Sequence, residues 1–433
     1  MEPLTQQLER DFKVTGNSWI DRIRKEAFQS LAQLPYPTSE QEEWKYTDVE
    51  PIVGAPFRLA ERKELLVPFE KRKHLTFSGI HAIRRVFVNG YHCPKLSSTE
   101  PLPQGVIVDN LATILQNNPK RVEPYLSRYA KDQNNPFIAI NTAFFQEGAF
   151  LYLPKGITLE HPIHLVYFSQ SNGAAAVSHP RTLVIAEEGS EARIVETYIG
   201  DGSYWTNAVT EIVLGENARI HSCKIQEESA EAFHLSTLFI HQNRDSRASS
   251  HVISLGGKIT RNDVRALLDA EGSEVTLNGL TMASDNQHVD NQTLIDHAKP
   301  HSTSDELYKG ILDGKSNGVF NGRIVVRPNA QKIRAQQTNK NLLLSDDAKM
   351  NTKPLLEIHA DDVRCNHGAT IGRLDENQLF YLRSRGMGEA EARTLLTYAF
   401  ASDMIQRLAY GPLETYLEIL LLQRLGHAEE ELR

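Results

Sequence analysis

A turn followed by a strand recurs in the middle of the chain, and this repeat limits the folds open to it. The copies are Glu188–Ile194, Gly215–Ile220 and Glu271–Leu277. Gly189 and Gly215 are 26 positions apart (215 − 189), and Gly272 follows after 57 (272 − 215), about two periods. Asp245–Ala248 stands where the missing copy is expected. A strand repeat of roughly 20 to 50 residues without propeller signatures predicts a parallel β-helix.

Stacked coils of a β-helix share one core, because a single coil cannot bury its inward face alone. We therefore expect a continuous core of inward Val, Ile and Leu side chains. Short alternating strands also occur in jelly rolls, and the strand pattern alone leaves that alternative open.

Three regions follow from the change of period along the chain. Residues 1–150 read as an N-terminal helical and mixed region, residues 151–375 as the β-helix core and residues 376–433 as a C-terminal helical domain. Apolar residues of the last region recur at helical spacing and predict a surface for docking a partner, although a solenoid end also needs a cap. The docking candidates are Leu395, Phe400, Met404, Leu413, Leu417 and Leu421.

Composition excludes several classes of partner and site. Lys and Arg total 47 against 55 Asp and Glu, so the net charge of −8 offers no basic surface for nucleic acid or anionic lipid. Without a secretory or membrane-spanning segment, we expect a soluble cytoplasmic protein. The cysteines, Cys93, Cys223 and Cys365, form no Cys-x-x-Cys. One chain therefore cannot supply four thiolates to an iron–sulfur cluster.

Several segments resemble the SufB/SufD family of iron–sulfur cluster assembly scaffolds. They are Glu43–Thr47, Asn321–Val326, Gln336–Leu344, Glu357–Gly372 and Gln378–Gly386. The resemblance implies a right-handed parallel β-helix between N- and C-terminal helical domains. SufB-type chains carry a cysteine for the nascent cluster near Leu344–Met350, and this chain has none there. The sequence Asn366–Thr370 also follows the SufD form.

Cys365 and His367 are the candidate ligands. Separated by one residue on a strand, they would point to the same face, and thiolate and neutral imidazole both bind iron. The resemblance places a nascent cluster or iron at the boundary between SufB and SufD, so that His367 completes a site shared with SufB and this chain alone holds no cofactor. For Cys365 the alternative is a small buried hydrophobe. Nearby His359, Asp361 and Asp362 are expected to form a solvated turn, and the alternative is a role beside the iron ligands or in iron entry.

The sequence contains no Gly-x-x-x-x-Gly-Lys-Ser/Thr loop, so we expect a non-catalytic scaffold subunit. The resemblance assigns ATP hydrolysis to the SufC ATPase, which would dock on the C-terminal helices around Thr394 to Leu425. SufB is the other expected partner, and without SufB the sequence leaves a monomer, a homodimer and a heterodimer open.

Two enzyme classes remain as alternatives. A β-helix enzyme acting on polysaccharide would need a secretory signal and clustered acidic or Arg side chains, and a cupin-like metalloenzyme would need several His on adjacent strands. The remaining histidines have no metal-ligand spacing and are expected on the surface or in turns. They include His161, His164, His221, His234, His251, His288 and His297.

Overall fold

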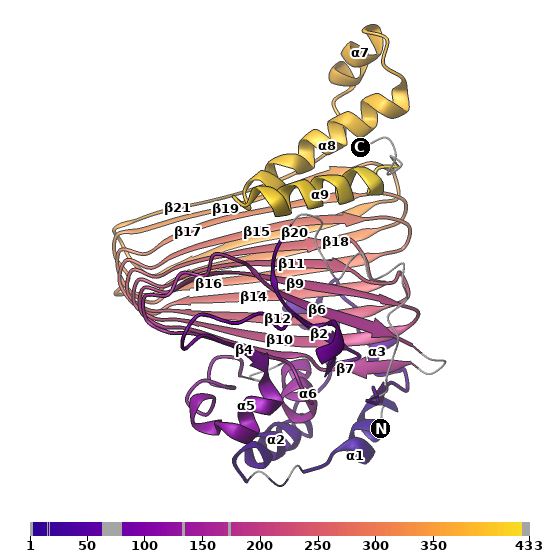
Figure 1. Ribbon diagram of the computed structural model, residues 1–433. Helices are drawn as coiled ribbons and strands as arrows, with labels where there is room; N and C mark the ends of the chain where they lie inside the picture. The colour runs from indigo at the N-terminus through magenta and orange to yellow at the C-terminus, as the bar shows by residue number, and fades with distance from the viewer. Residues whose placement is uncertain are drawn as a thin grey trace.

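The chain folds as a parallel β-helix with helices at both ends, as the sequence predicts (Figure 1). The computed structural model describes residues 3–14, 16, 18–62, 80–131, 135–171 and 175–426. Within this part of the chain, no helix is long and apolar enough to cross a membrane. Successive strands alternate between two sheets, so each coil of the solenoid contributes one strand to each sheet.

Sheet A has 11 strands. Its main path from the C-terminal end is β20 (Lys349–Ile358), β18 (Asn317–Val326), β16 (His288–His297), β14 (Ile259–Leu268), β12 (Phe233–Gln242), β10 (Tyr204–Leu214), β8 (Arg181–Ala186), β5 (Ala149–Leu153) and β4 (Ile107–Asn110). The short strands β1 (Arg58–Leu59) and β7 (Ala176–Ser178) pair with each other, and β7 also pairs with β10. All pairs are parallel except β4 with β5.

Sheet B has 10 strands. In order they are β21 (Val363–Gly372), β19 (Ile333–Leu343), β17 (Thr303–Leu312), β15 (Glu274–Ala283), β13 (Arg247–Ser254), β11 (Arg219–Glu227), β9 (Glu191–Asp201), β6 (Ile163–Gln170), β2 (Ile83–Val88) and β3 (Tyr91–His92). The β-helix core, predicted to begin at residue 151, begins earlier in the structure, because β2 and β4 and the start of β5 precede that residue.

The repeat predicted from the sequence is a turn that precedes the strands of sheet B from β9 to β19. One residue of each turn has a positive φ, and the residue after it is buried. These turn residues are Gly189, Asn217, Asp245, Gly272, His301 and Lys332. Gly189 is thus equivalent to Asn217, not to Gly215, and the repeat here is 28 residues (217 − 189). Asp245 does occupy the predicted place of the missing copy.

Serines stabilise four of these turns from inside. Ser190 Oγ donates to the Glu187 carbonyl at 2.7 Å, and Ser246 Oγ donates to the Asn243 carbonyl at the same distance. Ser273 and Ser302 repeat the bond one and two coils later. The Gly-Ser pairs visible in the sequence are therefore turn chemistry that satisfies buried carbonyl groups.

The interior of the solenoid is only partly the aliphatic core that the sequence predicts. Apolar side chains such as Val184, Ile212 and Leu277 fill part of it. A second group of inward positions is polar, and includes Glu196, Lys224, His234, Asn262, Asn291, Glu306 and Gln337. The expected core of inward Val, Ile and Leu is therefore present, and polar side chains are buried beside it where hydrogen bonds satisfy them.

The N-terminal region packs outside the first coils. Its elements are α1 (Pro3–Asp11), α2 (Ser18–Leu31), η1 (Glu42–Trp44), α3 (Glu50–Val53), η3 (Pro94–Leu96), α5 (Leu111–Asn117), η4 (Pro119–Arg121) and α6 (Pro136–Phe144). Phe137 of α6 contacts Trp205 of β10 edge to face, with 6.0 Å between ring centroids. The helices of this region therefore share an apolar core with the outer face of sheet A.

The C-terminal region consists of α7 (Glu376–Ser384), α8 (Glu389–Gln406) and α9 (Gly411–Arg424). Met404, Leu413 and Leu417 pack against Ile253 and Leu280 on the outer face of sheet B. Figure 1 shows α9 and part of α8 lying along the solenoid, whereas α7 projects beyond its last coil.

Candidate functional site

The C-terminal end of the solenoid is an open end. The last strands, β20 and β21, are 10 residues long each, and nearly all of β21 is exposed. The sheets end differently at the N-terminal side, in β4 with 4 residues and β3 with 2. Long exposed edges offer unpaired backbone groups to another chain, and short edges do not. We therefore place the candidate site on the last coil.

His367 lies on β21 at this open end. It pairs in register with Gln337 of β19, whose side chain is buried inside the solenoid. Adjacent in-register residues of parallel strands face the same side of a sheet. The imidazole of His367 therefore belongs to the inward-facing row, yet it is exposed because no further coil covers it.

Cys365 has a different environment from His367, although both lie on the same face of β21. It pairs with Ala335 and packs against the interior apolar cluster. Burial raises the pKa of the Cys365 thiol, and a bond from the backbone of Ala335 partly opposes the rise. A thiol with a raised pKa is a weaker ligand at neutral pH than a thiolate. The geometry thus favours His367 over Cys365 as the group offered to a partner.

The neighbouring turn holds His359, Asp361 and Asp362, all exposed. Asp362 pairs with Lys332 of the preceding coil, and its backbone N–H donates to Gln331 Oε1 at 2.9 Å. Among the described residues, no three His, Cys, Asp or Glu side chains come together as a metal site.

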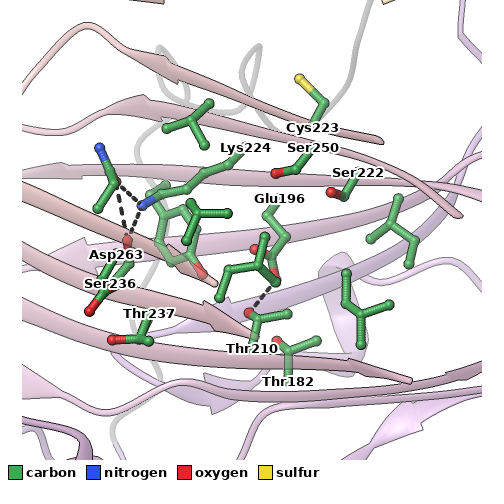
Figure 2. Close-up of a pocket in the computed structure, with 18 of the residues that line it drawn as sticks. Thr182, Glu196, Thr210, Ser222, Cys223, Lys224, Ser236, Thr237, Ser250 and Asp263 are labelled. Carbon is green, nitrogen blue, oxygen red and sulfur yellow. Dashed lines mark hydrogen bonds between the residues drawn. The ribbon is translucent and has the colours of Figure 1, made fainter. Parts of the chain in front are cut away.

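A pocket lined by both polar and apolar side chains lies between the sheets, deeper in the solenoid (Figure 2). Lys224 Nζ donates to His234 Nε2 at 2.6 Å, Ser236 Oγ at 2.5 Å and Asn262 Oδ1 at 2.7 Å. Burial lowers the pKa of Lys224 to about 7, against the attraction of Glu228 and Glu196. All three ammonium protons have acceptors, so we read this pocket as an internal part of the fold.

The six docking candidates divide into two groups. Met404, Leu413, Leu417 and Leu421 are buried against sheet B and one another, so they attach the helices to the solenoid and are not available to a partner in this arrangement. Phe400 is partly buried beneath Lys309, whose Nζ lies 4.6 Å from the ring centroid. Leu395 is exposed. Phe380 and Tyr381 on α7, which the sequence did not single out as docking residues, are more exposed still.

Four of the seven other histidines named from the sequence are buried in the structure. His164, His234, His251 and His297 are buried, and the expectation that they lie on the surface or in turns is wrong. Burial lowers the pKa of His297 to about 4, and its ring accepts or donates bonds to Ser302 and Ser304 at 2.7 and 3.0 Å. Their inward positions follow from strand register, which histidine spacing along the chain does not reveal.

Fold and site together define a parallel β-helix protein whose last coil is open and carries Cys365 and His367 on one face. Comparison with known proteins identifies the family. Residues 167–400 match the family described as SUF system FeS cluster assembly, SufBD core domain, and residues 4–165 match the SufBD protein N-terminal region. The chain therefore belongs to the SufB/SufD family, and it is of the SufD type.

Individual relatives agree with this assignment. The chain is 31% identical to the iron–sulfur cluster assembly protein SufD of Escherichia coli over 402 residues, 92% of this chain and 91% of that protein. It is 32% identical to an iron–sulfur cluster assembly SufBD family protein of Synechocystis over 410 residues, 92% and 90% of the two chains. SufD of Bacillus subtilis is 26% identical over 90% of both chains. Membership of this family favours a role in iron–sulfur cluster assembly over the two enzyme alternatives, a β-helix enzyme acting on polysaccharide and a cupin-like metalloenzyme.

Proposed function

We propose that the chain works as the SufD subunit of a cytoplasmic SUF scaffold, with SufB covering its open end. The observation that carries this proposal is the open end of the solenoid. There β20 and β21 leave long edges uncovered, and His367 of β21 lies at the end of the inward-facing row of sheet B. Pairing through such an edge is a common mode of association between sheets. The net charge of −8 supports a protein partner over nucleic acid.

The proposed chemistry of His367 is ligation of iron or of a nascent iron–sulfur cluster, which is the cargo of the assembly. A neutral imidazole offers one lone pair, and the thiolates come from SufB. The exposed position of His367 at the end of the inward row supports this role, because a ligand from a second chain can reach it. Cys365 contributes packing beside it.

We further propose that SufC binds the projecting helices α7 and α8 and carries out all ATP hydrolysis. Phe380 is 74% exposed and Leu395 is 42% exposed, and both lie away from the contact with sheet B. Exposed apolar and aromatic side chains of this size are typical of protein interfaces. Movement of these helices by SufC would reach the last coil, because α7 follows β21 after only three residues.

The test uses the complete complex with SufB and SufC. His367→Ala should leave copurification of all three subunits intact and reduce cluster formation at least tenfold, measured by visible absorption after anaerobic reconstitution. His359→Ala, in the neighbouring exposed turn, is the matched control and should behave as the unmodified chain. Full cluster yield from the His367→Ala complex would refute the ligand role.

SufC docking needs its own experiment. Phe380→Asp together with Leu395→Asp should abolish copurification of SufC while SufB remains bound. Retention of SufC by this double variant would contradict the docking site. The control is Ile419→Asp on α9, an exposed apolar residue outside the proposed surface.

A further inference from the structure

One row of side chains crosses the outer face of sheet B from coil to coil. Its members pair in register on successive strands from β9 to β21, in the order Glu191, Arg219, Arg247, Glu274, Thr303, Arg334 and Arg364. The residues that follow three of them, Ile220, Ala248 and Val275, belong to the interior core. Because successive side chains of a strand point to opposite faces, the row itself faces outward. We call it the outer charge row.

The first pair of arginines in the outer charge row lies between two glutamates. Arg219 Nη1 is 3.7 Å from Glu191 Oε2, and Arg247 Nε is 3.3 Å from Glu274 Oε2. Two like charges side by side on one face of a sheet repel each other, and an opposite charge next to each of them offsets the repulsion. In this part of the solenoid each arginine therefore has a carboxylate on the side away from the other arginine.

The second pair of arginines, Arg334 and Arg364, lacks these glutamates. Both side chains are exposed, and neither forms an ion pair with a residue that the structure describes. On one side their neighbour in the row is Thr303, which is uncharged. On the other side the row leaves the chain, because Arg364 lies on β21, the last strand of sheet B. The position beside Arg364 is therefore open to a residue of another chain.

Two acidic side chains close to this pair of arginines have cations of their own. Asp305 on β17 lies 2.9 Å from Arg407 Nη1 of the C-terminal region, measured to Oδ2. Asp362, just before β21, pairs with Lys332. The charge of Arg364 is thus not balanced by these two nearby carboxylates.

We propose that the strand which adds to β21 comes from a different protein and carries Asp or Glu directly beside Arg364. That carboxylate takes the place in the outer charge row that Glu191 takes beside Arg219. The inference rests on the proposed function, since it concerns the partner that covers the open end. It adds the charge of the partner strand and the position of that charge in the register.

A second copy of this chain does not offer such a strand. Its β21 has no acid on the outer face, where the residues are Arg364, Asn366, Gly368, Thr370 and Gly372. On the outer face of β20 the acid is Glu357, and its Oε2 already lies 2.6 Å from Arg323 Nη2. Neither edge strand of a second copy therefore has an unpaired carboxylate to place beside Arg364. Complementary charge favours a different, acidic partner strand over self-association.

The first experiment measures the affinity of the full chain for SufB, the proposed partner, at about 50 mM and about 500 mM salt. Arg364→Glu should weaken binding at least about fivefold at the lower salt concentration, because it places a like charge beside the partner's carboxylate. The loss should shrink at the higher concentration, where exposed charges are screened. Arg247→Glu makes the same change in the same row away from the open end and should bind as the unmodified chain does. Circular dichroism checks that both variants are folded.

A second measurement locates the partner's carboxylate. A carbodiimide joins an amine to a carboxylate that is in direct contact with it, so the Arg364→Lys variant in complex with SufB supplies the amine. Mass spectrometry should find position 364 linked to an Asp or Glu of SufB.

Equal affinities of Arg364→Glu and the unmodified chain at the lower salt concentration would overturn the inference. So would a cross-link from position 364 to a second copy of this chain, or no link from that position to SufB. In these cases binding of SufB by the unmodified chain still supports the proposed function. If the unmodified chain does not bind SufB, the proposed function fails and this inference fails with it.

Discussion

Arg261 of β14 lies over the indole ring of Trp44, with 3.6 Å between its guanidinium carbon and the ring centroid. The same guanidinium donates to the Glu43 carbonyl at 2.9 Å and pairs with Asp290 of β16. Thr47 also donates to Asp290, at 2.5 Å. Residues Glu43–Thr47, one of the segments that resemble the family, therefore attach the N-terminal region to sheet A. We call this segment the clip.

The clip should matter for stability. Trp44 is buried and packs against Phe137 as well as Arg261, so Trp44→Ala should lower the free energy of unfolding by about 3–5 kcal/mol. Urea unfolding followed by circular dichroism measures the change. Tyr46→Ala removes an exposed aromatic side chain from the same segment and should change the free energy by under about 1 kcal/mol. Equal losses in the two variants would contradict the clip.

The ion pair between Arg181 and Glu211 is fully buried, with 2.6 Å between Nη2 and Oε1. Glu211 also accepts backbone N–H bonds from Ser127, Tyr129 and Ala130. Arg181→Met leaves the carboxylate without its cation, and should cost about 3–5 kcal/mol in thermal or urea unfolding. Arg219→Met breaks a solvent-exposed pair with Glu191 and should cost at most about 1 kcal/mol.

Glu306 should make stability depend on pH. Its pKa rises from 4.5 in the unfolded chain to about 7 in the folded one, so the folded state binds the proton more tightly. Its penalty is absent below pH 4.5, grows as pH rises towards 7, and is complete above 7. Glu306→Gln should therefore stabilise the chain at pH 8 by up to about 3 kcal/mol relative to its effect at pH 4.5. If Glu306→Gln shifts the urea midpoint equally at pH 4.5 and pH 8, the raised pKa of Glu306 is contradicted.

The attachment of the C-terminal helices to sheet B can be tested at two aliphatic residues of α9 that differ in exposure. Leu417 is 2% exposed and Ile419 is 39% exposed. Leu417→Asp buries a charge against sheet B and should release the helices to limited proteolysis, whereas Ile419→Asp should leave them protected. Protection of both variants would mean that α9 does not depend on this contact.

The turn repeat was predictable from the sequence, but its alignment was not. Glycine marks the positive-φ position in only some coils, and Asn217, Asp245, His301 and Lys332 hold it in others. Aligning Gly189 with Gly215 therefore shifted the repeat by two residues. Short polar residues tolerate this conformation well enough that glycine alone is an incomplete guide.

The candidate site was predictable only where its residues are adjacent in sequence. Cys365 and His367 share a strand, and their common face follows from alternation alone. Glu306 and Gln337 join the row through register across successive coils, which no local pattern encodes. The contacts of Leu413 and Leu417 were not predictable either. An apolar stripe on a helix has the same sequence pattern whether it packs against the β-helix of its own chain or against another protein.

The unequal ends of the solenoid set a limit on the size of any assembly built through them. Among the described strands, only β20 and β21 leave long edges that no further coil covers, and the opposite end closes in the short strands β3 and β4, each paired antiparallel with its neighbour. Two such chains joined at their open ends leave no long edge of the described sheets for a third. Growth stops at a pair, so the geometry that permits strand addition also prevents fibre formation.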